Sequence, residues 1–202
     1  MTTRVLTVDA ARPPLASIDE AAAVLEGGGL VGFPTETFYG LGAAIGHEDA
    51  VARIFRIKGR PDSKPLLILV ESAAMVETVA EVSDEARALM ARYWPGALTL
   101  VLPARAAVPA LVTAGTGTVG VRHSAHPLAS ALVRRLHAPV TAPSANHSGG
   151  PPPTTAAEVL QAFDGQIEAV IDGGRTAGGL PSTVLDLTVF PPCIRRQGAV
   201  VL

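Results

Sequence analysis

The chain has 202 residues, 48% of them hydrophobic and only 4% aromatic, so we expect one domain with a core built mainly from aliphatic side chains. Charged residues make up 17% and the formal net charge is −2, which argues against a disordered chain and against a broadly basic nucleic-acid-binding protein. The single cysteine, Cys193, excludes an intramolecular disulfide and an all-cysteine zinc site, and we expect it to be buried.

The N-terminal half is predicted to alternate strands and helices. Arg4–Val8 alternates apolar and polar residues, which indicates a short strand. Ser17, with Glu20 three residues later, matches a capping box, so we expect a helix from Ser17 to the glycines 27–29. The expected elements that follow are a buried strand at Leu30–Phe33 leading into a turn at Pro34–Tyr39, a helix at His47–Ile57, a central strand at Pro65–Val70, a helix from Ser83 to Trp94 and a strand at Leu98–Leu102.

The C-terminal half continues this alternation, without a strict strand–helix–strand rhythm. We therefore predict the α/β fold class, with residues 1–202 forming a single domain and a twisted mixed sheet flanked by helices. No apolar run approaches the roughly 20 residues of a membrane helix, and the first residues lack the apolar segment of a signal peptide, so we expect a cytoplasmic protein. The expected elements are strands at Thr118–Arg122, Ala169–Asp172 and Thr183–Leu187, helices at Pro127–Leu136 and Thr155–Phe163, an extended segment at Pro139–Thr141 and a final strand near Ala199.

Basic residues at three places are candidates for binding an anion. Lys58 and Arg60 flank Gly59 just after a predicted helix, where they either bind adjacent phosphates or interact favourably with the helix macrodipole. Arg122 ends an apolar strand and Arg196 lies in another apolar segment, where an unpaired guanidinium is costly. We therefore expect an anionic partner for both, either a ligand or a neighbouring carboxylate.

Hydroxyl and amide side chains cluster at predicted turns. Thr35 and Tyr39 follow a strand end, where α/β sheets usually bind ligands, and Ser144 and Asn146 form a Ser-x-Asn turn. Each set either donates hydrogen bonds to a ligand or only satisfies the backbone of its own turn.

Motifs of several enzyme classes are missing. The chain has neither a G-x-x-x-x-G-K-[ST] phosphate loop nor a G-x-G-x-x-G turn between strand and helix, and it lacks the G-x-S-x-G elbow of hydrolases. His123 and His126 lie close in sequence without an HExxH motif or paired cysteines, so we expect no metal site. These absences favour a reaction in which the substrate supplies its own nucleophile and the protein positions it against a nucleotide phosphate.

Several short motifs, taken in their order and spacing, resemble the YrdC/Sua5 family of threonylcarbamoyl-AMP synthases. The resemblance runs from about Ser17 to Leu202. Its motifs are Pro34–Leu41 (PTETFYGL), Lys58–Pro61 (KGRP), Lys64–Leu66 (KPL), Trp94–Thr99 (WPGALT), Val119–Arg122 (VGVR), Pro143–Asn146 (PSAN) and Ser182–Asp186 (STVLD).

This resemblance implies a single domain with a large cationic concavity and a nucleotidyltransferase activity. The enzyme would condense L-threonine, bicarbonate and ATP to threonylcarbamoyl-AMP and pyrophosphate, with Mg²⁺ bridging the phosphates. A separate transferase would use the product to modify adenosine 37 of tRNA. By resemblance, Lys58 and Arg60 are catalytic, the ATP site comprises Lys58, Arg60, Thr118, Ser144, Asn146 and Arg196, and the threonine site comprises Thr35, Tyr39, Arg122, Thr141 and Thr183.

Two further expectations concern domains and partners. The longer Sua5 branch carries a C-terminal extension domain, and we expect none here. The alternative to the synthase is a non-enzymatic module that binds double-stranded RNA through the same concavity or acts in ribosome maturation. We expect transient contact with the transferase machinery and with tRNA or double-stranded RNA, and none with a membrane.

Overall fold

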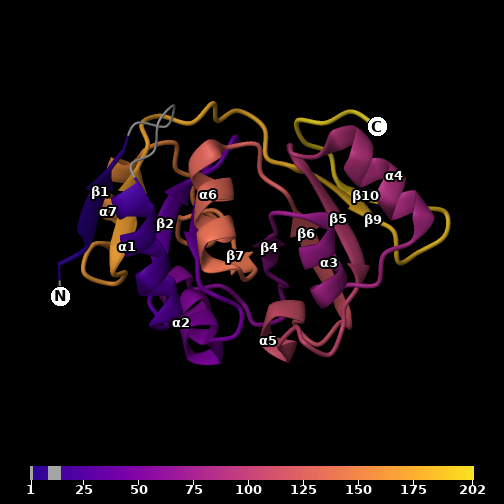
Figure 1. The fold of residues 1–202 in the computed structure, drawn as a ribbon, viewed down its shortest axis with the longest axis horizontal. Coiled ribbons are helices and arrows are strands. Elements are labelled where there is room, and N and C mark those ends of the chain that lie inside the picture. Colours follow the sequence, from indigo (N-terminus) through magenta and orange to yellow (C-terminus); the bar gives the residue numbers. More distant parts are fainter. Residues whose placement is uncertain (1, 9–14) are drawn as a thin grey trace.

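The computed structural model describes residues 2–8 and 15–202, and over these residues the chain forms two β-sheets (Figure 1). The first sheet has, within the described part, four strands in the order β1-β8-β2-β3. β8 is parallel to β1 and β2, whereas β2 and β3 form an antiparallel hairpin. The bounds are β1 Arg4–Thr7, β2 Val31–Pro34, β3 Tyr39–Gly42 and β8 Ala169–Asp172.

Helices cover both faces of this first sheet. Alternate residues of β8 face opposite sides, as expected for a strand. Ala169 and Ile171 pack in one core cluster with α1 and α6, and Val170 packs in another with α7. The helices are α1 Leu15–Glu26, α6 Pro127–Leu136 and α7 Ala156–Phe163.

The second sheet has six strands among the described residues, in the order β10-β9-β5-β6-β4-β7. The pairs β5–β9 and β4–β6 are parallel, and the remaining neighbours are antiparallel. Its strands are β4 Leu67–Leu69, β5 Leu98–Pro103, β6 Thr118–Arg122, β7 Val140–Thr141, β9 Thr183–Asp186 and β10 Cys193–Arg196. The remaining described helices are α2 Glu48–Lys58, α3 Ala73–Val79, α4 Asp84–Tyr93 and α5 Ala110–Thr113.

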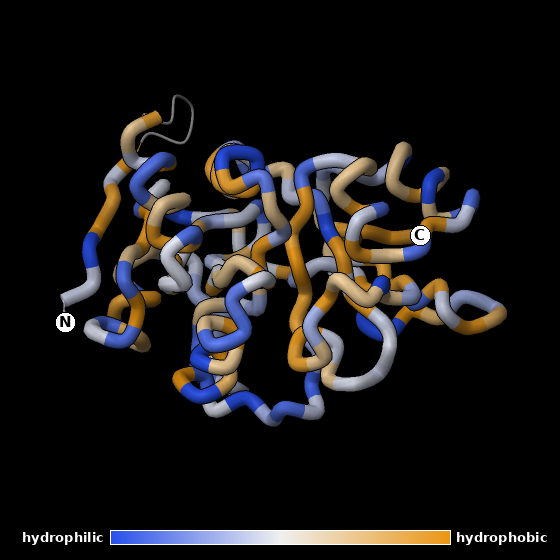
Figure 2. The backbone as a smooth tube through the Cα atoms, turned by 60° about the horizontal axis from the view of Figure 1, so that its bottom comes forward, coloured by the Kyte–Doolittle hydropathy of each residue, from blue (hydrophilic) through white to orange (hydrophobic). Residues whose placement is uncertain are grey.

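The two sheets join along β3 and β7. Isolated bridges connect Gly40 with Ser144 and Ala44 with Val140. The buried hydroxyl of Thr141 accepts a hydrogen bond from the N–H of Ala43 at 2.9 Å and donates to the carbonyl of Leu41 at 3.1 Å. In Figure 2, hydrophobic stretches (orange) run through the middle of the molecule, and many hydrophilic stretches (blue) lie in outer loops. This junction therefore fixes the turns that carry the predicted polar residues.

The predicted α/β class is confirmed. The prediction of one mixed sheet is wrong in detail, because the strands form two separate sheets. Tyr39 was expected to end a turn, and it instead begins β3, whose two glycines hid the strand pattern. The final strand lies at Cys193–Arg196 rather than near Ala199. Cys193 is exposed rather than buried, because β10 is an edge strand of the second sheet.

Several helix predictions also need correction. α1 already includes Leu15, so Ser17 lies inside the helix and is not its N-cap. The short helices α3 and α5 were not expected. The start of α4 is confirmed: the hydroxyl of its N-cap Ser83 accepts from the N–H of Ala86 at 3.2 Å. Of the described helices, none is long and apolar enough to cross a membrane.

Candidate functional site

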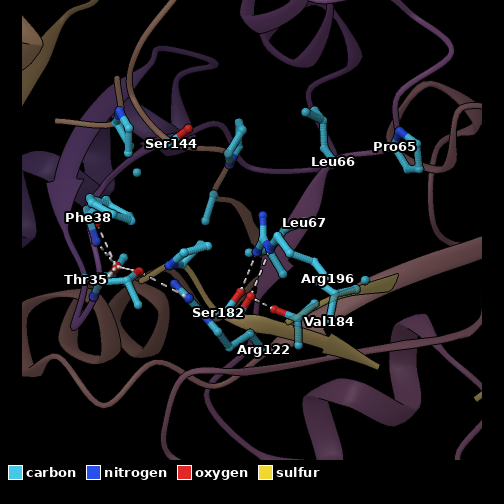
Figure 3. A pocket seen from close by; sticks show the side chains of 18 of the residues that line it. Thr35, Phe38, Pro65, Leu66, Leu67, Arg122, Ser144, Ser182, Val184 and Arg196 are labelled. Atoms are coloured by element: carbon cyan, nitrogen blue, oxygen red, sulfur yellow. Dashed lines mark hydrogen bonds between the residues drawn. The ribbon is translucent and has the colours of Figure 1, made fainter. Parts of the chain in front are cut away.

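A cavity of about 520 Å³ lies where the two sheets meet (Figure 3). The described residues in its wall include three arginines and no aspartate or glutamate, which favours an anionic ligand. Three predicted site residues, Lys58, Thr141 and Thr183, are buried nearby but do not line it. The predicted residues that do line it are Thr35, Tyr39, Arg60, Thr118, Arg122, Ser144, Asn146 and Arg196.

The hydroxyl of Thr35 organises the turn between β2 and β3. It donates to the carbonyl of Phe38 at 2.7 Å and accepts from the N–H groups of Thr37 and Phe38 at 3.2 and 3.3 Å. The hydroxyl of Thr37 lies 3.0 Å away and also lines the cavity. Thr35 therefore shapes the cavity wall through its own turn, which leaves its hydroxyl little capacity for a ligand.

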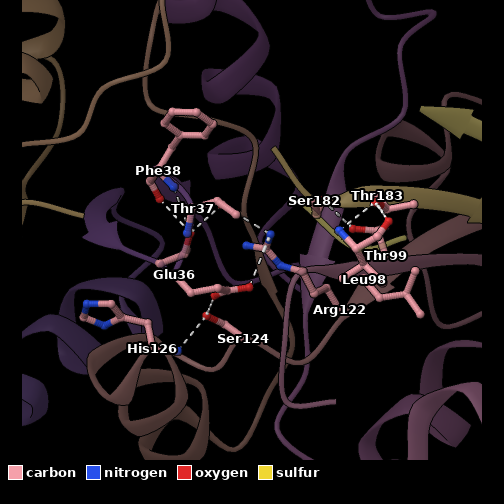
Figure 4. Close-up of polar contacts among 12 residues, drawn as sticks. Glu36, Thr37, Phe38, Leu98, Thr99, Arg122, Ser124, His126, Ser182 and Thr183 are labelled. Atoms are coloured by element: carbon pink, nitrogen blue, oxygen red, sulfur yellow. Dashed lines mark hydrogen bonds and ion pairs between the residues drawn. The ribbon is translucent and has the colours of Figure 1, made fainter. Parts of the chain in front are cut away.

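Arg122, at the end of β6, is the most deeply buried cation in the cavity wall, with 3% of its surface exposed. Its Nη1 lies 3.5 Å from the hydroxyl of Thr37 and 3.7 Å from Oε1 of Glu36 (Figure 4). Among the described residues, its Nε has no hydrogen-bond partner. Burial lowers the pKa of the Arg122 guanidinium, and the charge of Glu36 opposes that shift. Because a buried guanidinium with so few hydrogen bonds is costly, an anion from the cavity fits this position.

Arg196 is oriented by Ser182, a residue that was not among the predicted site residues. Its Nε donates to the carbonyl of Ser182 at 3.0 Å and its Nη2 to the hydroxyl at 2.9 Å. That hydroxyl lies 2.8 Å from the hydroxyl of Thr99, and both line the cavity. Because Arg196 lies on the exposed strand β10, its environment does not require the anionic partner that burial was expected to impose.

Thr183 follows Ser182 and has a different environment. Its buried hydroxyl donates to the carbonyl of Val200 at 2.6 Å and accepts from the N–H groups of Gly198 and Val200 at 3.0 and 3.1 Å. Thr183 thus fixes the C-terminal segment against β9, while Ser182 faces the cavity. The two adjacent hydroxyl residues could be recognised in the sequence, but the sequence did not show which of the two side chains points into the cavity.

Lys58 supports the Ser-x-Asn turn from behind. Its Nζ donates to the carbonyl oxygens of Ser144 and Asn146, each at 2.5 Å. Burial, with a contribution from the charge of Arg60, lowers the pKa of Lys58 to about 8. Gly59 adopts a left-handed conformation with φ of 59°, which ends α2 and turns the chain toward Arg60.

Asn146 lines the cavity, and both donors of its amide are already used by backbone carbonyl oxygens. Its Nδ2 donates to the carbonyl oxygens of His147 and Gly150 at 2.9 and 2.7 Å. These bonds identify the amide nitrogen, and Oδ1 is buried without a partner among the residues described. A ligand group that donates a hydrogen bond, an ordered water molecule or a cation would satisfy this oxygen.

The remaining predicted residues also have local hydrogen bonds. Arg60 donates from Nε and Nη2 to the carbonyl oxygens of Lys64 and Pro65 at 3.1 and 2.7 Å. Tyr39 donates its hydroxyl to the carbonyl of Gly174 at 2.7 Å, and burial, followed by the charge of Asp172, raises the pKa of Tyr39 to about 12. The hydroxyl of Thr118 lies 2.9 Å from that of Thr116. Across residues 2–8 and 15–202, no three His, Cys, Asp or Glu side chains are grouped as metal ligands would be.

Comparisons with known proteins agree with this geometry. The model of the Sua5/YciO/YrdC family, described as "Telomere recombination", matches residues 23–198. Threonylcarbamoyl-AMP synthase of Pyrococcus abyssi is 50% identical over 183 residues, and that of Bacillus subtilis is 45% identical over 185 residues. These alignments cover 90% and 91% of this chain but 54% of each relative, so the chain spans about half the length of these curated relatives.

A solved structure provides an independent comparison. The crystal structure of Pyrococcus abyssi Sua5 complexed with L-threonine superimposes with a TM-score of 0.94 and 48% identity, covering 97% of this chain and 58% of that one. Sequence and fold thus lead to the family that the motifs predicted. The chain belongs to the Sua5/YciO/YrdC family.

Proposed function

We propose that this chain synthesises threonylcarbamoyl-AMP from L-threonine, bicarbonate and ATP, releasing pyrophosphate. The observation that carries the proposal is the buried Arg122, which has unused donors in a cavity with two further arginines and, among its described lining residues, no acidic side chain. A substrate with a carboxylate and phosphates suits such a wall. The names of the two curated relatives and the threonine-bound Sua5 structure support threonine and ATP among these substrates.

The cavity would hold threonine beside ATP. We assign Thr35, Tyr39, Arg122, Thr141 and Thr183 to the threonine side, with Arg122 binding the carboxylate and Thr141 and Thr183 acting through the backbone that they fix. The nucleotide side comprises Lys58, Arg60, Thr118, Ser144, Asn146 and Arg196.

In the proposed reaction the substrates supply the nucleophile. The amine of threonine adds to the carbon of CO₂ derived from bicarbonate and loses a proton, which gives a carbamate. A carbamate oxygen then attacks the α-phosphorus of ATP, the bond to the bridging oxygen breaks, and pyrophosphate leaves. Arg60 and Arg196 would stabilise charge on the phosphates, and Lys58 would hold the turn that carries Ser144 and Asn146. Because the substrates supply the attacking atoms, the reaction requires no protein nucleophile.

Magnesium is proposed as part of the nucleotide substrate. Because the described residues form no cluster of metal-ligating side chains, the ion would depend on phosphate oxygens and water, with the acceptor of Asn146 as the available amide oxygen. We further propose that residues 1–202 act as one catalytic domain in the cytoplasm and pass the intermediate to a tRNA-modifying transferase. No described feature favours the alternative of a double-stranded RNA-binding module.

Pyrophosphate release tests the proposal. The purified chain is incubated with Mg-ATP, L-threonine and bicarbonate, and each component is omitted in turn. We expect release that depends on both threonine and bicarbonate, together with incorporation of labelled bicarbonate into an adenylate. Release that persists without threonine, or no release with all components present, would contradict the proposed function.

A further inference from the structure

Glu36 lies behind the cavity wall in a fixed position. Its neighbours Thr35 and Thr37 line the cavity, whereas Glu36 does not. Its Oε2 accepts a short hydrogen bond from the hydroxyl of Ser124, which is 1% exposed and also accepts from the N–H of His126 at 3.2 Å. Figure 4 shows this carboxylate between Ser124 and the guanidinium of Arg122. The serine therefore anchors one oxygen of Glu36 and leaves the other toward the arginine.

The contact between Glu36 and Arg122 is loose. Oε1 lies 3.7 Å from Nη1 of Arg122, and this buried oxygen has no hydrogen bond to the residues described. At that distance the charges still attract, but the donors of the guanidinium are not consumed. A tight bidentate pair would instead occupy the arginine fork that a ligand needs.

The other edge of the same guanidinium is unused. Nη1 is turned toward Glu36 and Thr37, while neither Nε nor Nη2 makes a hydrogen bond to a described residue. The Nε–Nη2 edge presents two parallel N–H groups, which match the two oxygens of a carboxylate. The orientation of Arg122 thus determines whether a carboxylate in the cavity meets two donors or one.

We propose that Glu36, anchored by Ser124, is a positioning residue that holds Arg122 by its Nη1 edge and leaves the Nε–Nη2 edge for the carboxylate of an amino-acid substrate. Its negative charge also compensates the buried guanidinium before the substrate binds. The inference rests on the proposed function, because it assigns the ligand carboxylate to threonine. It adds a residue that acts on substrate binding without touching the substrate.

Glu36→Gln tests this role because it keeps the shape of the side chain and removes the charge. Ser124→Ala removes only the anchor, and Glu71→Gln is the matched control, since Glu71 pairs with Arg134 at 3.4 Å and does not line the cavity. L-threonine binding is measured by calorimetry without ATP, together with KM for threonine, KM for ATP and the unfolding temperature. This design separates substrate orientation from general stability.

We expect Glu36→Gln to weaken threonine binding by about tenfold, Ser124→Ala by about threefold and Glu71→Gln by less than about twofold, with KM for ATP nearly constant. Threonine affinity within twofold of the wild type in Glu36→Gln would overturn the inference. So would a parallel loss for threonine and ATP with a lower unfolding temperature. If Glu36→Gln does not fold, the threonine affinity of Ser124→Ala tests the inference instead, and an unchanged affinity in that variant overturns it. A wild type that binds no threonine overturns the proposed function as well, which distinguishes the two failures.

Discussion

Lys58→Met removes a buried ammonium and keeps most of the aliphatic side chain. The two hydrogen bonds from Nζ to Ser144 and Asn146 are charge-assisted, and such bonds contribute roughly 1.5–3 kcal/mol each. Desolvation opposes them, because the fall in the pKa of Lys58 from 10.5 to about 8 corresponds to about 3 kcal/mol. At pH 7 we therefore expect a net loss of only about 1 kcal/mol in the free energy of unfolding.

The dependence on pH is the sharper measurement. Because the pKa of Lys58 is lower in the folded chain, the unfolded chain binds more protons between pH 8 and pH 10.5. The contribution of this group to stability is therefore nearly constant below pH 8 and grows as the pH rises from 8 toward 10.5. Between pH 7 and pH 9.5 the wild type should gain about 2 kcal/mol relative to Lys58→Met.

Guanidinium-induced unfolding at pH 7, 8.5 and 9.5 measures this difference. Lys64→Met is the matched control because Lys64 is exposed on the neighbouring segment, and its curve should follow the wild type. Parallel curves for the wild type and Lys58→Met across this range would refute the reasoning that burial of the ammonium governs its energetics. Lys58→Met should also lower turnover, because the turn that carries Ser144 and Asn146 loses its support.

Two further substitutions separate structural from ligand-binding roles. Thr183→Val removes three hydrogen bonds of a buried hydroxyl, so thermal unfolding should show a loss of about 2 kcal/mol. Because Thr183 acts on the threonine side through the backbone that it fixes, KM for threonine should rise together with that loss, and a rise in KM without a loss of stability would show direct contact instead. Asn146→Asp replaces the amide donor that binds the carbonyl oxygens of His147 and Gly150 by a carboxylate oxygen, which is an acceptor. The turn should then lose its shape, and KM for ATP should rise by at least about tenfold. An unchanged KM for ATP would remove Asn146 from the nucleotide side.

The sequence predicted which residues form the site better than it predicted where their side chains point. Arg122 could be singled out because a cation at the end of an apolar strand needs a partner, and the structure gives it Glu36 and the cavity. Ser182 and Thr183 could not be told apart, since alternation along β9 decides which hydroxyl faces the cavity. The way the two sheets join depends on contacts such as that of Gly40 with Ser144, which connect residues far apart in the chain and leave no local pattern.

The hydrogen bonds of the site show which of its polar groups remain free to select a ligand. The hydroxyls of Thr35, Thr141 and Thr183 each bond to backbone groups, so these threonines define the cavity by fixing its walls. The free capacity lies instead in the guanidinium edge of Arg122 and the amide oxygen of Asn146. A ligand that satisfies both must present an anionic group to one side and a hydrogen-bond donor or a cation to the other. L-threonine carries a carboxylate with N–H and O–H donors, and a magnesium nucleotide carries phosphates with a cation, so both proposed substrates have groups that meet this requirement.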